Sequence, residues 1–217
     1  MKPARAGEQP CTAEVDRLVA DHPFALLVSA TAQAPVATPL PLLLERDTDG
    51  SAWLVGHFAR NNPQLAMLRR QPRALAVFTG AHGYMSPSWL RDRTQAPTWY
   101  YATVHFDVEV ELLEQETATH DALERLVAHM EAGRADAWHA AELGARYPRL
   151  AAAVVAFRAR IVATHARFKL GQGERDDVLA DQCAALASDG QYALLAAMDR
   201  AVAAPVSPAA TRAGSPA

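Results

Sequence analysis

Apolar residues recur along the chain in two patterns, short strand-like runs and stretches with helical spacing. The runs at 24–29 and 74–79 are apolar at successive positions, which is typical of strands buried on both faces. Residues 99–112 alternate instead, with Ala102, Val104 and Phe106 on one side and Trp99 and His105 on the other. We therefore expect a long, half-exposed strand there.

Prolines constrain the strand expected at 36–44. Pro39 and Pro41 share one face of it and cannot donate a hydrogen bond to a neighbouring strand, which predicts a sheet edge or a distorted stretch. A turn at 47–50 predicts a hairpin partner. The remaining strands are expected at 52–58, 154–162 and 164–170.

Helical spacing and capping residues predict five helices. The sharpest start is at Asn62, a good N-cap, because Pro63 suits the first helical position. The helices are expected at 12–21, from this start to about 70, and at 117–131, 174–187 and 191–204. Residues 80–89 are expected to form a long loop.

Neighbouring strands with few helices between them predict a mainly β fold with peripheral helices (α+β), an antiparallel barrel. We expect a tail and short helix at 1–21, one barrel domain at 22–187, a C-terminal helix at 188–204 and a disordered tail at 205–217.

Composition narrows the possible functions. The 217 residues carry a net charge of -3, which rules out a generally basic nucleic-acid binder and gives no support to direct DNA binding. Cys11 and Cys183 lie at opposite ends of the chain and indicate a reducing compartment. No apolar leader and no run long enough to span a bilayer are visible, so we expect a cytoplasmic protein without membrane contact.

The common catalytic motifs are missing from this sequence. Gly171-Gln-Gly173 resembles the opening of a dinucleotide fingerprint, but the third glycine and the βαβ pattern are absent. His57, His82 and His105 come from different segments and show no metal-ligand spacing, so no metal is expected and polar surface positions are the simpler interpretation.

Cationic residues favour a phosphate-bearing ligand. Arg60 precedes the helix start at Asn62, where backbone N–H groups and the helix dipole attract an anion. Arg158 and Arg160 share one face of a predicted strand, and Arg167 and Lys169 share one face of the next. If the two strands form a hairpin, four cations gather on one patch; a solvated strand face is the alternative.

Six short motifs occur in a fixed order between residues 22 and 180. They are His22-Pro-Phe24, Ala37-Thr38, Gly56-His-Phe-Ala-Arg60-x-Asn62-Pro63, Tyr84-x-Ser86-Pro-Ser-Trp89, Pro97-Thr-Trp99 and Lys169-Leu-x-Gln172. In this order they resemble the PaiB-type family of FMN-binding negative transcriptional regulators.

The resemblance implies a split antiparallel β-barrel of the FMN-binding type, related to pyridoxamine-phosphate oxidase-like flavin proteins. It also implies a homodimer with FMN at the interface between the subunits. Arg60 and Asn62 would hold the flavin phosphate, and Thr38 and His57 would line the pocket. The remaining pocket residues implied by the resemblance are Trp99, Lys169 and Gln172.

Four positions depart from the family's usual residues. Pro39 replaces a histidine, Tyr100 replaces an asparagine, and Gly171 and Gly173 replace a serine and an asparagine. These changes remove polar groups, so weaker flavin binding or a reshaped pocket is expected. The two glycines are also expected to leave backbone room for a larger ligand.

Three functions remain open at this point. The first is a flavin-binding regulator, and the second is an FMN-dependent oxidoreductase acting on a small-molecule substrate. The weak candidates for proton transfer in that reaction are His82, Tyr84, Tyr100 and His105. The third is a barrel that has lost flavin and holds another cofactor, such as haem, through a histidine.

Overall fold

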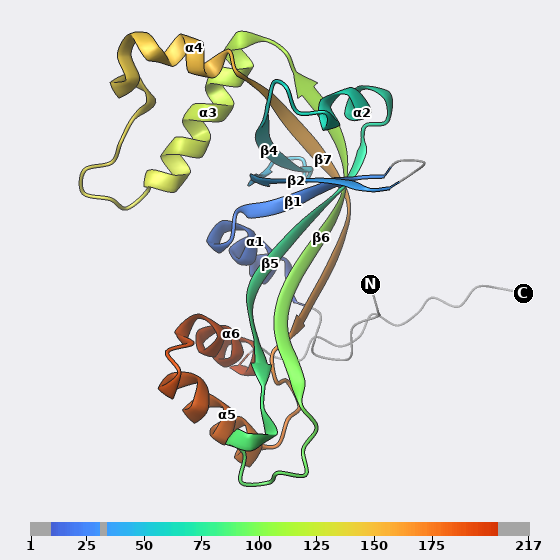
Figure 1. Cartoon of the computed structure of the whole chain (residues 1–217), viewed down its shortest axis with the longest axis vertical. Coiled ribbons are helices and arrows are strands. Elements are labelled where there is room, and N and C mark those ends of the chain that lie inside the picture. Colours follow the sequence, from blue (N-terminus) through green and yellow to red (C-terminus); the bar gives the residue numbers. More distant parts are fainter. Residues whose placement is uncertain (1–9, 31–33, 204–217) are drawn as a thin grey trace, which may run out of the picture. The chain divides into compact units, whose positions relative to one another are not determined.

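A computed structural model of the chain describes residues 10–30 and 34–203 (Figure 1). The strands are β1 (Phe24–Ser29), β2 (Val36–Pro41), β3 (Leu43–Arg46), β4 (Ala52–Ala59), β5 (Arg73–Met85), β6 (Thr98–Leu113) and β7 (Val154–Lys169). The α-helices are α1 (Thr12–Asp21), α2 (Gln64–Arg70), α3 (Glu116–Glu131), α4 (Tyr147–Ala151), α5 (Asp176–Ser188) and α6 (Tyr192–Ala203). Two 3-10 helices are η1 (Pro87–Trp89) and η2 (Ala140–Arg146). The predicted tail at 205–217 and most of the predicted tail before residue 12 lie outside the described residues.

The chain forms two compact units. The barrel unit contains residues 16–78 and 104–165 and includes residues from all seven strands. Of the described residues, the second unit contains 10–15, 79–103 and 166–203, so α5 and α6 belong to it. The single domain predicted at 22–187 stays a prediction.

One residue joins the two edges of the sheet. The strand order is β2-β1-β5-β6-β7-β4-β3, so β2 and β3 are the edge strands. Only Leu42 separates them in the sequence, and its side chain is completely buried. The chain therefore passes from one edge of the sheet directly to the other, which produces an open, split barrel. The predicted mainly β fold class is confirmed.

The edge position predicted from the prolines is confirmed. Strand β2 pairs antiparallel with β1, and Pro39 stands opposite Leu26 while Pro41 stands opposite Phe24. A proline has no N–H to offer to a further strand, and an edge strand is where a sheet tolerates that loss.

The corner at Leu42 packs directly on β4. A Cβ atom added to Gly56 would lie 2.7 Å from Leu42 Cδ2, 3.1 Å from Phe157 Cζ and 3.1 Å from Pro41 O. Glycine is thus the residue that fits this close approach. Beside it, the rings of Phe58 and Phe157 lie 4.9 Å apart and form part of the barrel core.

The long loop predicted at 80–89 is wrong for its first half. Strand β5 continues to Met85, and only Pro87–Trp89 leaves it as a 3-10 turn. The glycine at 83, typical of a loop, instead allows close packing, because a Cβ there would lie 2.7 Å from Leu194 Cδ2 of α6. The local pattern predicted this helix but not its packing against the strand.

The break predicted between strands at 154–162 and 164–170 is also wrong. Strand β7 runs without a break from Val154 to Lys169. The residues around Ala163 carry no glycine, proline or asparagine that would favour a turn. The four cations on this segment therefore belong to one strand and do not face each other across a hairpin.

We predict that Leu42→Ala lowers the free energy of unfolding by about 2–5 kcal/mol, since it leaves a cavity at the only link between the sheet edges. Leu150→Ala is the control, because Leu150 is 41% exposed and its truncation is expected to change the stability by less than about 0.5 kcal/mol. Urea unfolding followed by circular dichroism measures both. Equal losses in the two variants would contradict the importance of the corner.

Candidate functional site

A network of side-chain hydrogen bonds surrounds the start of α2. Thr38 Oγ1 donates to Gln64 Oε1 at 2.6 Å, and Asn62 Nδ2 donates to Thr38 Oγ1 at 3.0 Å. Gln64 Nε2 donates to Leu27 O at 3.0 Å and to Ser29 Oγ at 2.8 Å. Gln64 and Ser29 are almost completely buried, so the network fixes α2 to β1 and β2.

Helix α2 begins one residue later than predicted, with Pro63 as its N-cap and no side-chain cap at that position. Asn62 Oδ1 accepts a hydrogen bond from Gln64 N at 2.8 Å, which satisfies one of the free N–H groups of the first helical turn. Both ends of the Asn62 amide are therefore engaged by the chain itself. The segment that carries Arg60 is held rigidly at this end.

Arg60 is anchored where β7 begins. Its Nε donates to Ala152 O at 2.7 Å, and its Nη2 donates to Val154 O at 2.9 Å. A guanidinium has five N–H donors in a planar fork. These contacts use two of them and orient the group, while donors for an anion remain.

His57 lies on β4 in the barrel unit. It shares one face of β4 with Val55, which packs with Ala122 of α3 and Ala156 of β7. Among the described residues, none forms a hydrogen bond with the buried Nδ1 atom of His57. Burial lowers the pKa of His57, so its imidazole is neutral at pH 7 and offers hydrogen bonding without positive charge.

Lys169 and Gln172 lie in the second unit, where β7 ends. Lys169 Nζ donates to Thr98 Oγ1 and lies 5.9 Å from the centre of the Tyr100 ring. Gln172 closes the following turn, because its Oε1 accepts from Leu170 N at 2.8 Å and its Nε2 donates to Phe168 O at 2.8 Å. The turn therefore holds the end of the strand and the lysine on it.

Trp99 forms an aromatic cluster with His82 and Tyr84 in the second unit. The Trp99 ring lies 6.1 Å from each of the other two, nearly parallel to His82 at 26° and tilted from Tyr84 by 46°. Trp99 is 50% exposed and Tyr84 is 45% exposed. The cluster thus offers aromatic surface to a ligand.

Two other proton-transfer candidates are less accessible. Tyr100 is fully buried, and burial raises its pKa to about 12, so it keeps its proton at neutral pH. His105 is half-buried on β6 in the barrel unit, and burial is the main cause of its lowered pKa. The structure therefore joins His82 and Tyr84 to Trp99, but it does not join the four candidates in one group.

The room expected beside Gly171 is taken by Tyr100. A Cβ atom at Gly171 would lie 2.9 Å from Leu179 Cδ2 and 3.2 Å from Tyr100 Cε2, and φ is +91° there. The expectation of space for a larger ligand is thus wrong at Gly171. At Gly173, which also has a positive φ, no atom of the described residues lies within 4 Å of the added Cβ.

The patch of four cations, which depended on a hairpin, does not form. Arg158 pairs with Glu111 at 2.8 Å and also lies 4.6 Å from the centre of the Trp53 ring. Arg160 pairs with Glu109. Both arginines are thus neutralised by the neighbouring strand β6, and the hairpin that would have added Arg167 and Lys169 is absent.

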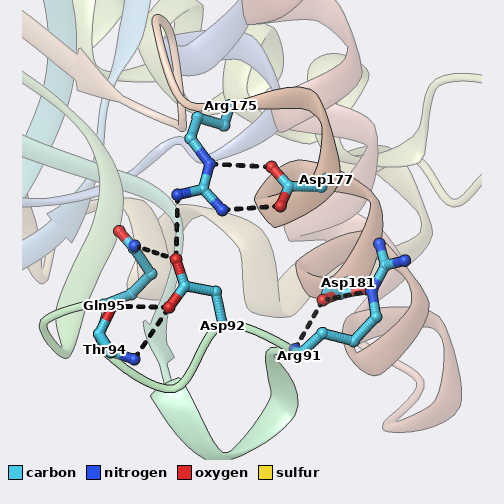
Figure 2. A network of polar contacts seen from close by, with 7 residues as sticks. All are labelled: Arg91, Asp92, Thr94, Gln95, Arg175, Asp177 and Asp181. Carbon is cyan, nitrogen blue, oxygen red and sulfur yellow. Dashed lines mark hydrogen bonds and ion pairs between the residues drawn. The ribbon is translucent and has the colours of Figure 1, made fainter.

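A polar network missed by the sequence analysis holds the segment before β6 (Figure 2). Arg175 Nη1 donates to Asp92 Oδ2 at 2.9 Å, and Arg175 Nη2 donates to Asp177 at 2.7 Å. Asp92 also accepts hydrogen bonds from Thr94 and Gln95, which hold its pKa well below the usual range. Segment 91–97 is thereby fixed to the start of α5.

A second ion pair adds to this attachment. Arg91 donates from its backbone N and its Nε to Asp181 on α5, at 2.9 and 3.0 Å. Two residues that follow the segment depend on it. The hydroxyl of Thr98 accepts the hydrogen bond from Lys169, and Trp99 supplies the indole of the aromatic cluster. Their positions therefore depend on polar contacts made several residues earlier.

The predicted cofactor-binding residues fall into separate groups. Thr38 and Asn62 share one network in the barrel unit, with Arg60 between them and β7. His57 lies on β4 of the same unit. Trp99, Lys169 and Gln172 belong to the second unit. Within the described ranges, no three His, Cys, Asp or Glu side chains gather as a metal site would require.

Comparison with known proteins identifies sequence relatives. Residues 1–163 match the family described as "Putative FMN-binding domain". The chain is 34% identical over 103 residues to the protease synthase and sporulation protein PAI 2 of Bacillus subtilis, covering 48% of this chain and 49% of that protein. It is 34% identical over 73 residues to an uncharacterized protein of Saccharomyces cerevisiae, covering 32% and 43%. The chain spans about half the length of these relatives or less.

Solved structures with a similar fold include two haem or flavin proteins. The FAD and heme binding protein from Mycobacterium smegmatis has a TM-score of 0.60 and 21% identity, with 80% of this chain and 79% of that chain covered. The flavocytochrome Anf3 from Azotobacter vinelandii has a TM-score of 0.57 and 15% identity, with 79% and 74% covered. At these identities the likeness establishes the fold alone. Among the described residues, no helix is long and apolar enough to cross a membrane.

We predict that Gln64→Leu lowers the free energy of unfolding by about 1–3 kcal/mol, because it leaves buried polar groups on β1 without their partner. Gln71→Leu, which follows the other end of α2 and is exposed, serves as the control and is expected to change little. Urea unfolding measures both variants. A stable Gln64→Leu protein would show that the network does not fix α2.

Proposed function

The chain belongs to the PaiB-type family of FMN-binding domains, and from this membership we propose that it binds FMN as a homodimer and acts in flavin-dependent redox chemistry or sensing. The observation that carries the proposal is the family match over residues 1–163. The split-barrel fold and the cationic and aromatic side chains described above support it.

The fit to a flavin rests on groups that the fold already orients. Arg60 is fixed by two carbonyl oxygens and retains N–H donors for a phosphate. We assign Asn62 to the support of this segment and Thr38 and His57 to the pocket lining. In the second unit, Lys169, Gln172 and Trp99 are the proposed flavin-binding residues.

A bound flavin would supply hydride or single-electron transfer, which side chains alone do not provide. The protein's own contribution would be orientation and proton handling. His82 and Tyr84 are the proposed proton-handling groups beside Trp99. Tyr100 keeps its proton at neutral pH because burial raises its pKa to about 12. The substrate would be a small molecule.

An exposed apolar face on the barrel unit supports the homodimer. Phe24 is 67% exposed and Leu26 is 43% exposed, and both point outward from β1. Their partners in the adjacent strands are Pro41 and Pro39 of β2, with Val77 of β5 beside Leu26. Directly opposed residues of paired strands share a face, so the apolar surface is continuous over three strands. A second copy of this chain is its proposed occupant.

The alternative is a diverged barrel that has lost flavin and binds haem. The FAD and heme binding protein and the flavocytochrome share this fold. His57 favours the alternative, since it is neutral and its buried Nδ1 lacks a partner among the described residues. The absorption spectrum of the purified protein separates flavin, haem and empty states.

We predict that Arg60→Ala weakens FMN binding about tenfold to a hundredfold and leaves riboflavin binding nearly unchanged. The substitution removes charge-assisted hydrogen bonds of about 1.5–3 kcal/mol to a phosphate that riboflavin lacks. Quenching of flavin fluorescence on titration measures both ligands. Arg69→Ala, which removes an exposed arginine paired with Glu114, is the control. Equal losses for FMN and riboflavin would assign Arg60 to holding the start of β7 only.

We predict a dimer at micromolar concentration that Leu26→Glu converts to monomer, because a charge would be buried without a partner at the apolar face. Leu150→Glu is the matched control, since Leu150 is 41% exposed and Leu26 is 43% exposed. Light scattering measures the mass of each protein. A monomeric wild type, or a dimer that survives Leu26→Glu, would remove the proposed interface.

A further inference from the structure

Lys169 is unusual in this chain because lysine is so rare. The sequence contains two lysines, Lys2 and Lys169, and every other basic residue apart from histidine is an arginine. Lys169 is therefore the single lysine among the described residues. An ammonium group is a compact charge on a flexible stem, so it contributes to binding most effectively when its surroundings fix it.

Two contacts from β6 fix this ammonium. Thr98 Oγ1 accepts a hydrogen bond from Lys169 Nζ, and the Tyr100 ring centre lies 5.9 Å from the same atom. Thr98 and Tyr100 are two residues apart, so they lie on the same face of the strand. Within the described part of the chain, Thr98 is the one hydrogen-bond acceptor of an ammonium that carries three N–H donors.

The Tyr100 ring is itself held in place by the backbone at Gly171. With φ at +91°, this residue is in a region that favours glycine, and a Cβ would approach Tyr100 Cε2 to 3.2 Å. Tyr100 is 1% exposed. Its ring thus lies in the space that a side chain at position 171 would need. The position of the Tyr100 ring therefore depends on a glycine at 171.

The hydroxyl of Tyr100 interacts with Gln182 and not with Lys169. The side chain of Gln182, which is also buried, forms a hydrogen bond with Tyr100 that lowers its pKa against the larger opposite effect of burial. The feature of Tyr100 that acts on Lys169 is therefore the π face, which attracts a cation.

We propose that Tyr100 is a positioning residue, whose ring, seated on Gly171, holds the Lys169 ammonium in place for a negatively charged part of the flavin. This inference rests on the proposed flavin binding. The inference adds that Tyr100 and Gly171, two of the positions that depart from the family's usual residues, act together by fixing Lys169.

The first test reads the position of Lys169 without any ligand. Protein labelled with 13C-lysine gives two sets of side-chain signals, and Lys169→Met identifies the set that belongs to Lys169. The Tyr100 ring current is expected to shift the Lys169 ε-proton signal upfield. Tyr100→Phe should keep the shift, whereas Tyr100→Leu should remove it.

Tyr101→Leu is the matched control for this measurement. Tyr101 is the next residue on β6, and its ring lies 5.9 Å from the Arg167 guanidinium instead. The Lys169 signal should stay unchanged. Gly171→Ala is a second variant, which displaces the ring without removing it and should also move the signal. The proposal is overturned if the Lys169 signal of the wild-type protein shows no upfield shift. It is also overturned if the signal stays the same in both Tyr100→Leu and Gly171→Ala.

The second test measures binding of FMN and riboflavin by fluorescence quenching. Tyr100→Leu should weaken FMN binding about threefold to tenfold, the range expected for a cation–π contact, while Tyr100→Phe stays within about twofold. In the Lys169→Met background, Tyr100→Leu should have no further effect, because the ring acts through the ammonium. A loss confined to FMN places the ammonium at the phosphate, and an equal loss for riboflavin places it at the ring system.

The outcomes separate this inference from the proposed function. If wild-type protein binds no flavin while the Lys169 signal responds as expected, the proposed function fails and the packing of Tyr100 on Lys169 stands. If flavin binds but Tyr100→Leu weakens it equally with and without Lys169, the positioning role is overturned and flavin binding stands.

Discussion

The passage of the chain through Leu42 is the constraint on which the barrel unit depends. One residue must carry the chain from the β2 edge to the β3 edge, so the corner has to pack tightly on whatever lies beneath it. Gly56 provides that contact because no side chain there would fit. With the corner fixed, Thr38 on β2 comes within hydrogen-bond reach of α2, and the network that orients the Arg60 segment becomes possible.

The two groups of proposed flavin-binding residues are prepared by different physical means. In the barrel unit, a buried amide, Gln64, connects strands and helix through directional hydrogen bonds. In the second unit, a glycine with a positive φ and a buried ring fix Lys169 by shape, and exposed ion pairs on α5 hold the segment before Trp99. Surface ion pairs individually add little stability, so several are combined at segment 91–97.

Local patterns in the sequence predicted most elements but not their partners. The helices at 12–21 and 117–131 follow from apolar spacing, and the β2 edge follows from Pro39 and Pro41, since each signal lies within the element itself. The continuation of β5 past Gly80 depends on α6, which lies far along the chain and covers Gly83. The break expected in β7 had no turn residue to support it, and the arginines of the continuous strand pair with acidic residues of β6.

The site was only partly predictable for the same reason. The sequence motifs and the argument for an anion site both pointed to Arg60, Asn62 and Lys169. Gln64 follows the Asn-Pro helix start as an ordinary helix former, and nothing local reveals that its amide is buried against Ser29 and Leu27. Ser29 ends an apolar run, which gives a weak signal for a buried polar partner. From the sequence, Tyr100 and Gly171 were two separate losses of a polar group. Only the folded chain shows that the Tyr100 ring packs against Gly171.

The prolines of β2 also determine how this surface can meet another molecule. A strand edge without N–H donors at positions 39 and 41 does not extend a sheet by ladder formation, which is one way that proteins avoid uncontrolled aggregation. Contacts on this side of the barrel must then form through side-chain faces and the release of water. Association of that kind weakens on cooling and strengthens in sulfate or phosphate salts, in contrast to the ion pairs of segment 91–97, which salt screens. Sulfate or phosphate salts would therefore act in opposite directions on the surface of β1 and on the attachment of α5.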